Sequence, residues 1–207
     1  AKASGFFSYS AEVGSTNTLL NTGTITTSGG TGHGMESKDS RSGATSTLTS
    51  SGTITTTGTS AYGMFSDSSS GTETFINSGT ITTSGQYGHG LYSEDQQSGA
   101  TSTLTNSGTI TTTGANALGL YSNDNDGTTT LTNSGTITTS GTSSYGIESY
   151  DNAGTSTLTN SGTVTTSGNY GYGIFLNSNT GTATITNSGT IKVTGSNAVG
   201  IKMDGGV

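Results

Sequence analysis

A glycine motif recurs along the whole chain at a nearly constant interval. The glycine that follows Asn-Ser, or a close variant of it, falls at Gly23, Gly52, Gly79, Gly108, Gly135, Gly162 and Gly189. The intervals are 29, 27, 29, 27, 27 and 27 residues, so seven units fill the chain and leave no second domain. We therefore predict a single repeat domain over residues 1–207. Because the chain begins and stops inside a unit, we expect it to be an excerpt of a longer array.

Each unit contains three short segments that are typical of strands. In the fourth unit these are 103–105 (TLT), 109–111 (TIT) and 119–122 (GLYS). Alternation of polar and apolar residues is the period of a half-buried strand. Glycine turns separate the segments, and we attribute these glycines to positive φ. Three strands in 27–29 residues predict an all-β fold, a single parallel β-helix or β-solenoid of about seven coils.

The low hydrophobic content, 26%, agrees with a solenoid. A coil needs only about three large apolar residues, because stacked coils bury them in continuous columns. Threonine and isoleucine also favour strands. The predicted inner columns are Leu48, Leu104, Leu131, Leu158 and Ile185; Ile25, Ile54, Ile81, Ile110, Ile137, Val164 and Ile191; and Met35, Met64, Leu91, Leu120, Ile147, Ile174 and Ile201.

The turn asparagine forms a further column, which we interpret as structural. Its members are Asn21, Asn77, Asn106, Asn133, Asn160 and Asn187, and Ser50 replaces asparagine in one coil. Stacked amides can bond to the coils above and below, and a turn asparagine bonds readily to nearby backbone.

The repeat unit resembles the passenger repeats of bacterial autotransporters (type V secretion). The shared pattern is N-[ST]-G-T-[IV], followed about ten residues later by [AG]-[YH]-G-[ILM], as in 77–81 and 88–91. The resemblance covers essentially the whole chain. It implies a right-handed parallel β-helix at the bacterial cell surface or outside the cell, in a family whose passengers are usually poor in cysteine, as here. It implies no particular activity, because this scaffold carries adhesins, proteases, toxins and inert stalks.

Charge and composition exclude several classes of function. The net charge is −7 and the five basic residues form no patch, so we expect no nucleic-acid partner. No apolar run approaches the ~20 residues of a membrane helix, so we expect no membrane-spanning segment. The absence of cysteine removes disulfides and thiol catalysis.

Residues suited to catalysis or metal binding do not converge in the sequence. His33 and His89 share a repeat position two coils apart, roughly 9.6 Å if coils stack at ~4.8 Å, which is too far to share a metal. Tyr62 takes this position in the coil between them. We expect no enzyme activity, cofactor, catalytic residue or metal site. The acidic residues predict a solvated ridge, with weak calcium binding left open, and they are Asp39, Asp67, Glu94, Asp95, Asp124, Asp126 and Asp151.

The position after the third-strand aliphatic residue is predicted to face outward. It is occupied by Phe7, Glu36, Phe65, Tyr92, Tyr121, Glu148, Phe175 and Lys202. Phe65, Tyr92 and Tyr121 lie on three consecutive coils. An exposed aromatic ladder can stack on sugars or anchor a protein, so these three are our candidate partner-binding residues. The alternative is that they stack on one another and stiffen the rod.

Threonines flank the central aliphatic residue of the TIT segment on both sides. They form two files on six coils, Thr24, Thr53, Thr80, Thr109, Thr136 and Thr163, and Thr26, Thr55, Thr82, Thr111, Thr138 and Thr165. A grid spaced roughly 6.7 Å along the strand and about 4.8 Å between coils resembles the Thr-x-Thr faces of ice-binding β-solenoids. Threonine is also simply a good outward strand residue, since its χ1 is stiff and Thr–Thr neighbours stabilise a sheet.

These observations favour a secreted or cell-surface structural or adhesive segment without catalysis. Its partners would be a host or matrix glycan or protein, or further copies joined end to end in a filament. The alternative is an ice-binding protein that uses the Thr-x-Thr face. A polysaccharide-degrading β-helix enzyme is a distant third.

Overall fold

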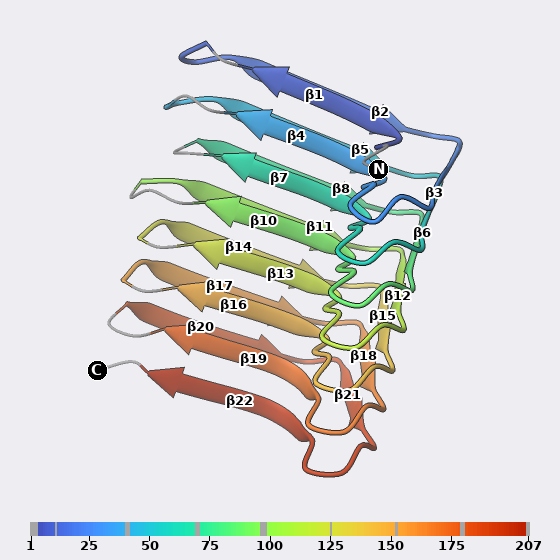
Figure 1. Ribbon diagram of the computed structural model, residues 1–207. Helices are drawn as coiled ribbons and strands as arrows, with labels where there is room; N and C mark the ends of the chain where they lie inside the picture. The colour runs from blue at the N-terminus through green and yellow to red at the C-terminus, as the bar shows by residue number, and fades with distance from the viewer. Residues whose placement is uncertain are drawn as a thin grey trace.

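The computed structural model describes residues 4–10, 12–39, 42–68, 71–95, 99–124, 126–151, 153–178 and 181–205. Within these residues every regular element is a strand, and the 22 strands form three parallel sheets that wind as one solenoid (Figure 1). Three strands make one coil, and each strand pairs with its counterpart in the next coil. The predicted fold class, an all-β parallel solenoid of about seven coils, is confirmed.

The strands of each sheet follow one another at intervals of three. Sheet A contains β1 (Phe6–Ser10), β4 (Met35–Asp39), β7 (Met64–Ser68), β10 (Leu91–Asp95), β13 (Leu120–Asp124), β16 (Ile147–Asp151), β19 (Tyr172–Ser178) and β22 (Val199–Gly205). Sheet B contains β2 (Thr16–Asn21), β5 (Thr45–Ser50), β8 (Thr72–Asn77), β11 (Thr101–Asn106), β14 (Thr128–Asn133), β17 (Thr155–Asn160) and β20 (Thr182–Asn187). Sheet C contains β3 (Thr24–Thr27), β6 (Thr53–Thr56), β9 (Thr80–Thr83), β12 (Thr109–Thr112), β15 (Thr136–Thr139), β18 (Thr163–Thr166) and β21 (Thr190–Val193).

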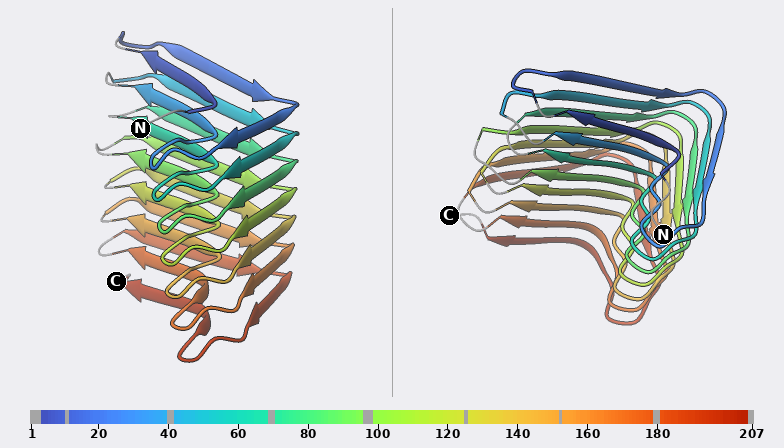
Figure 2. Two further views of the ribbon diagram at one scale, coloured as in Figure 1. Left: turned by 45° about the vertical axis from the view of Figure 1, so that its right-hand side comes forward. Right: turned by 45° about the horizontal axis from the view of Figure 1, so that its top comes forward.

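The three sheets enclose a narrow interior. Sheets A and B face each other, and sheet C closes one side between them (Figure 2). Coils stack in strict register, so that Leu91 pairs with Leu120, Leu104 with Leu131 and Ile110 with Ile137. Equivalent residues therefore lie directly above one another along the rod.

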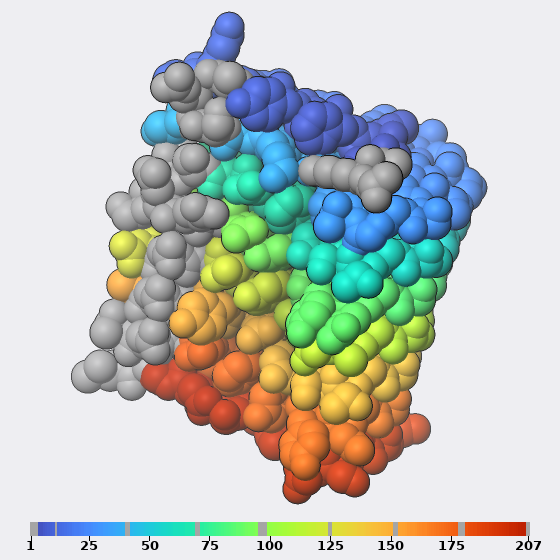
Figure 3. Space-filling model, viewed as in Figure 1, coloured from blue at the N-terminus to red at the C-terminus, as the bar shows by residue number. Residues whose placement is uncertain are grey.

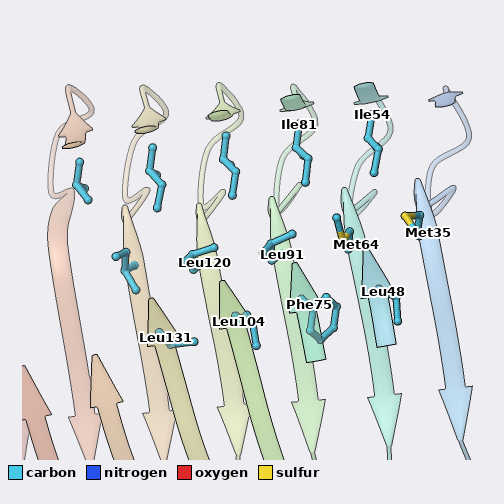
Figure 4. Packing of buried hydrophobic residues seen from close by; sticks show 14 of the residues in the cluster. Met35, Leu48, Ile54, Met64, Phe75, Ile81, Leu91, Leu104, Leu120 and Leu131 are labelled. Atoms are coloured by element: carbon cyan, nitrogen blue, oxygen red, sulfur yellow. The ribbon is translucent and has the colours of Figure 1, made fainter. Parts of the chain in front are cut away.

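The predicted apolar columns form the core (Figure 4), except in the last coil, where Ile185 and Ile191 are only partly buried and Ile201 is exposed. Leu104, Ile110 and Leu120 of one coil are all fully buried, one from each sheet. Two residues absent from our predicted columns complete the sheet B column. Leu19 and Phe75 are buried and pair with Leu48 from either side. Since each apolar column is continuous, one substitution in it disturbs the coils on both sides.

Positive φ, the predicted reason for the turn glycines, is found at Gly14, Gly43 and Gly99, which precede strands of sheet B. The glycines of the other corners are required for a different reason. Gly108 has no positive φ, but a Cβ at this position would lie 2.1 Å from the carbonyl oxygen of Gly79. A Cβ at Gly114 would lie 1.9 Å from the oxygen of Gly85. The corners of successive coils approach too closely for any side chain. In the turn that follows sheet C, positive φ is adopted by non-glycine residues, which are Ser60, Tyr87, Asn116, Ser143, Tyr170 and Asn197.

The asparagine column is confirmed as a structural element. Asn77 Nδ2 donates to Asn106 Oδ1 at 2.8 Å, and Asn106 Nδ2 donates to Asn133 Oδ1 at 2.8 Å. The same bond continues through Asn160 to Asn187. In addition, Asn77 Oδ1 accepts from the backbone N–H of Gly79. Each amide thus fixes its own corner and links it to the next coil.

Candidate functional site: the threonine wall and the aromatic face

The two threonine files form a regular wall on the outer face of sheet C. We call these twelve residues, from Thr24 and Thr26 to Thr163 and Thr165, the threonine wall. Adjacent members pair in register through all six coils. All twelve side chains are at least partly exposed. The seventh strand of the sheet continues the wall with Thr190 but has Lys192 in the second file.

Apolar and polar contacts on the inner face of sheet C support the threonine wall. Ile110 and its counterparts fill the core beneath it. The last threonine of each TITT segment points inward, and in β6 the hydroxyl of Thr56 donates to the carbonyl oxygen of Ala61 at 2.9 Å. Thr112 makes the same bond to Ala117. Strands β3, β6, β9 and β12 are therefore tied to the turn that follows them, whereas the buried hydroxyls of Thr139 and Thr166 have no hydrogen-bond partner within the described residues.

The outer face of sheet B is also rich in threonine, but it is less regular. Leu20 and Ile76 interrupt it, with 58% and 38% of their surface exposed. The files that contain Thr74, Thr103 and Thr130 are in register. This face has the composition of the threonine wall without its uniformity.

The candidate partner-binding aromatic residues are less accessible than predicted. We call Phe65, Tyr92 and Tyr121 the aromatic ladder. They stack on one another, with ring centroids 5.2 Å and 4.8 Å apart. However, Phe65 and Tyr92 are only 5% and 8% exposed, so the prediction of an exposed ladder is wrong for them, whereas Tyr121 is partly exposed. That the ladder binds a partner stays a prediction.

A second column of rings covers the ladder. We call His33, Tyr62 and His89 the ring column. They lie on the turns that lead into sheet A and stack at 4.7 Å and 5.1 Å. The ring of Tyr62 meets that of Tyr92 edge-on at 5.0 Å. Alternation along the strand placed the ladder on the outer face correctly, but it carried no information that the preceding turn folds over this face.

The histidines have a structural role in this column. Nδ1 of His33 accepts the backbone N–H of Tyr62 at 3.1 Å, and Nδ1 of His89 accepts that of Leu118 at 3.0 Å. A histidine that accepts at Nδ1 is neutral. Burial lowers the pKa of His89 to about 3, which keeps it in this form.

Burial also affects the ionisable groups of the ladder and its neighbours. It raises the pKa of Tyr92 and of Tyr121. The nearby carboxylate of Glu148 raises the pKa of Tyr121 further. Burial among these rings raises the pKa of Glu148 to about 7. The outer face of sheet A therefore carries titratable groups, unlike the threonine wall. Figure 3 shows this side of the molecule, with the coils in successive bands of colour.

The prediction of a solvated acidic ridge is wrong for Asp39, whereas Asp67 and Glu94 are partly exposed. Asp39, Asp67 and Glu94 lie in strands of sheet A. Asp39 is 3% exposed and accepts a hydrogen bond from Asn17 at 2.6 Å, so it faces the interior. Asp67 pairs with Lys38 at 3.0 Å. The side chains of Asp95, Asp124 and Asp151 lie outside the description, while Asp126 is exposed.

The interior beside Asp39 is polar, which the sequence analysis missed. Serines of sheet A bond across to sheet B, as between Ser37 and Ser46 at 2.9 Å and between Ser93 and Ser102 at 2.8 Å. Glu73 is buried there and accepts from Ser66. The serine of the G-[ILM]-x-S motif was the available signal, since it has the parity of the inner residues.

No metal centre is formed by the part of the chain that the structure describes, since no three histidine or carboxylate side chains come together there. None of the described residues belongs to a helix that is long and apolar enough to cross a membrane.

Fold and surface together define a β-solenoid repeat domain with one uniform outer wall. Comparison with protein families gives its affiliation. The model of the BigA third pectate lyase-like domain matches residues 39–153, more than half of the chain, and the chain belongs to this family. No curated protein and no solved structure matches it. The family match and the solenoid confirm the resemblance to β-helical passenger repeats.

Proposed function

We propose that this chain is part of a secreted or cell-surface rod that acts by contact, as a structural or adhesive element without catalysis. The threonine wall carries the proposal. Six consecutive coils present the same two partly or fully exposed side chains in register. A repetitive flat surface suits multivalent contact with a glycan or matrix protein, because weak contacts at several coils add up. Family membership supports the surface location.

The distribution of ionisable groups supports a role without catalysis. An active site needs such groups to converge. Here Asp39 and Glu73 are buried, at 3% and 1% exposure, and Asp67 pairs with Lys38. A net charge of −7 would also repel an anionic polysaccharide. We expect no loss of viscosity when the protein is incubated with pectin or alginate, and a loss of viscosity would contradict this part of the proposal.

Binding assays test the adhesive part directly. The domain would be applied to a glycan array and to immobilised collagen and fibronectin, with heat-unfolded protein as the control. Saturable binding by the folded domain alone is expected for at least one of these probes. Failure on all of them would remove adhesion and reduce the proposal to a structural rod.

Ice binding is the second candidate function, favoured by the register of the threonine wall. Methyl and hydroxyl groups repeat at the two strand spacings, roughly 6.7 Å and 4.8 Å. The test is thermal hysteresis and ice recrystallisation with the wild-type domain and with Thr82, Thr111 and Thr138 replaced by lysine. Activity in the wild type that is lost in the variant supports ice binding. Blank results in both assays exclude it.

A further inference from the structure

One residue on the outer face of sheet A interrupts the series of rings. Glu148 lies in register between Tyr121 and Phe175. Within the described residues it makes no hydrogen bond or ion pair. Its counterpart Glu36 differs, because Glu36 accepts a hydrogen bond from Ser4 at 2.6 Å and is fully buried. Glu148 is a partly exposed carboxylate that has no counter-charge within this part of the chain.

Aromatic residues occupy neighbouring positions on this face. Tyr145, on the turn that leads into β16, contacts Tyr172 at 4.7 Å and Phe175 at 5.8 Å between ring centroids. Tyr121 is the register partner of Glu148 in the neighbouring strand. The charge of Glu148 raises the pKa of both Tyr121 and Tyr145, after the larger effect of burial. Tyr121, Tyr145 and Glu148 are all partly exposed, and a ligand can reach them from solvent.

The same face already holds two ammonium groups over rings. Lys38 Nζ lies 5.6 Å from the ring centroid of Phe65 and pairs with Asp67. Lys202 Nζ lies 5.1 Å from the ring centroid of Phe175 and pairs with Asp204. Each of these places combines a ring, a carboxylate and a cation. Glu148 with Tyr121 and Tyr145 provides the first two of these components, whereas the ammonium group of Lys202 lies over Phe175 and Tyr172 and pairs with Asp204.

We propose that Glu148, Tyr121 and Tyr145 form a binding site for an organic ammonium ion supplied by a small molecule. Ring faces attract such a cation through their quadrupole, and the carboxylate supplies the counter-charge. The net charge of −7 favours the approach of cations over anions. This site does not depend on the threonine wall, and its existence is independent of the proposed function.

Choline is the test ligand, and 3,3-dimethylbutan-1-ol is its neutral control of the same shape. The ring resonances of Tyr121 and Tyr145 would be followed by NMR as each compound is added. Saturable shifts with choline, and none with the neutral control, are expected. Glu148→Gln should weaken choline binding about tenfold or more, whereas Glu12→Gln, which removes the same charge from a distant exposed position, should leave it unchanged.

The pH dependence provides a second readout. Choline binding should weaken as the pH falls below about 7, because the carboxyl of Glu148 then takes up a proton. The titratable groups that face it are Tyr121 from β13, Tyr145 from the turn, Tyr172 from β19 and Lys202 from β22, with His89 beyond Tyr121. The pKa of Tyr121, Tyr145 and Lys202 is raised and that of His89 is lowered to about 3, so none of these titrates near pH 7.

Three results would overturn the proposal. These are ring resonances that do not respond to choline, an equal response to the neutral control, and full binding by the Glu148→Gln variant. Tyr145→Leu keeps the carboxylate and removes one ring, so it provides a second variant. Weaker binding is expected for it, and unchanged binding would exclude Tyr145 from the site.

Discussion

The threonine wall and the aromatic face of sheet A stand on the same coils but differ in kind. On the wall, every coil from β3 to β18 presents the same pair of threonines. On the aromatic face, the equivalent position changes from Phe65 to Glu148 to Lys202, and rings from the preceding turns cover part of it. Repetition thus makes every coil of the wall alike. On the aromatic face, by contrast, side chains of different chemistry lie next to one another.

The comparison shows where each kind of binding can arise on a solenoid. A uniform wall suits an extended partner that contacts many coils at once. A position at which neighbouring coils differ can hold a small ligand, because only there do unlike groups meet. The two faces should also differ in how much they contribute to stability and in how they respond to pH.

The largest loss of stability should come from substitutions in the core, and it should be similar beneath the two faces. Ile110 lies beneath the wall and Leu120 beneath the aromatic face, and both are fully buried. Replacing either with alanine should cost about 2–5 kcal/mol, because a cavity remains in a continuous column. Urea denaturation of the two variants checks this. A cost below about 1 kcal/mol at one of the two positions would show that the column is not continuous there.

Removal of a ring should distinguish the aromatic face from the wall. Tyr92→Ala should cost about 3 kcal/mol, since this ring is buried between Phe65, Tyr62 and Tyr121. Tyr170→Ala removes the same side chain from an exposed turn and should stay within about 0.5 kcal/mol of the wild type. Equal losses in thermal unfolding would mean that Tyr92 does not support the fold.

Acidification should change the free energy of unfolding through two groups on the aromatic face, and their effects should oppose each other. The pKa of His89 is about 3 in the folded chain and 6.5 ordinarily, so its contribution is lost as the pH falls below about 6.5. The pKa of Glu148 is about 7 instead of 4.5, so its contribution is present at low pH and lost as the pH rises through 7. Between pH 7.5 and pH 5 each amounts to about 2 kcal/mol, and the two oppose each other.

Single variants separate these two contributions. Glu148→Gln should become less stable on acidification to pH 5, because only the effect of His89 remains. His89→Asn, which can keep an acceptor for the N–H of Leu118, should become more stable instead. Urea midpoints at pH 5 and pH 7.5 measure both. Identical pH profiles for the two variants and the wild type would contradict the assignment.

The smallest change in stability should result from substitutions on the threonine wall. Thr111→Ala should change the free energy of unfolding by no more than about 0.5 kcal/mol, because the side chain points outward and is partly exposed. The buried Thr112 of the same strand donates to Ala117 and should cost about 1 kcal/mol when replaced with valine. Equal costs, measured by chemical denaturation, would mean that the wall threonines support the fold.

Much of the fold could be predicted from the sequence, because the residues that make each contact recur in every repeat. Ile110, Leu104 and Asn106 each recur at one interval, and their inward or corner position follows from alternation and turn chemistry. The reason for Gly108 was misjudged, since the distance between stacked corners is a property of neighbouring coils. Phe75 was missed because this coil breaks the Thr-Leu-Thr pattern. It has Phe75 where the preceding coil has Leu48, and Ile76 where that coil has Thr49.

The surface was harder to predict than the core. Exposure of the threonine wall follows from strand alternation, and its register follows from the repeat. Burial of Tyr92 depends on Tyr62, which comes from a turn 30 residues earlier and reaches the same face only in the folded chain. The inward position of Asp39 depends on the length of β4, which extends beyond the predicted strand into the acidic segment.

Matched lysine substitutions on two faces of the same coils test most directly whether the threonine wall is the contact surface. One variant carries Lys at Thr82, Thr111 and Thr138 of the wall. The other carries it at Thr74, Thr103 and Thr130 on sheet B, in the same three coils. Lys192 shows that the wall position accepts lysine. In the glycan and matrix binding assay, the wall variant should lose binding and the sheet B variant should keep it. Equal binding by the two variants would contradict the account.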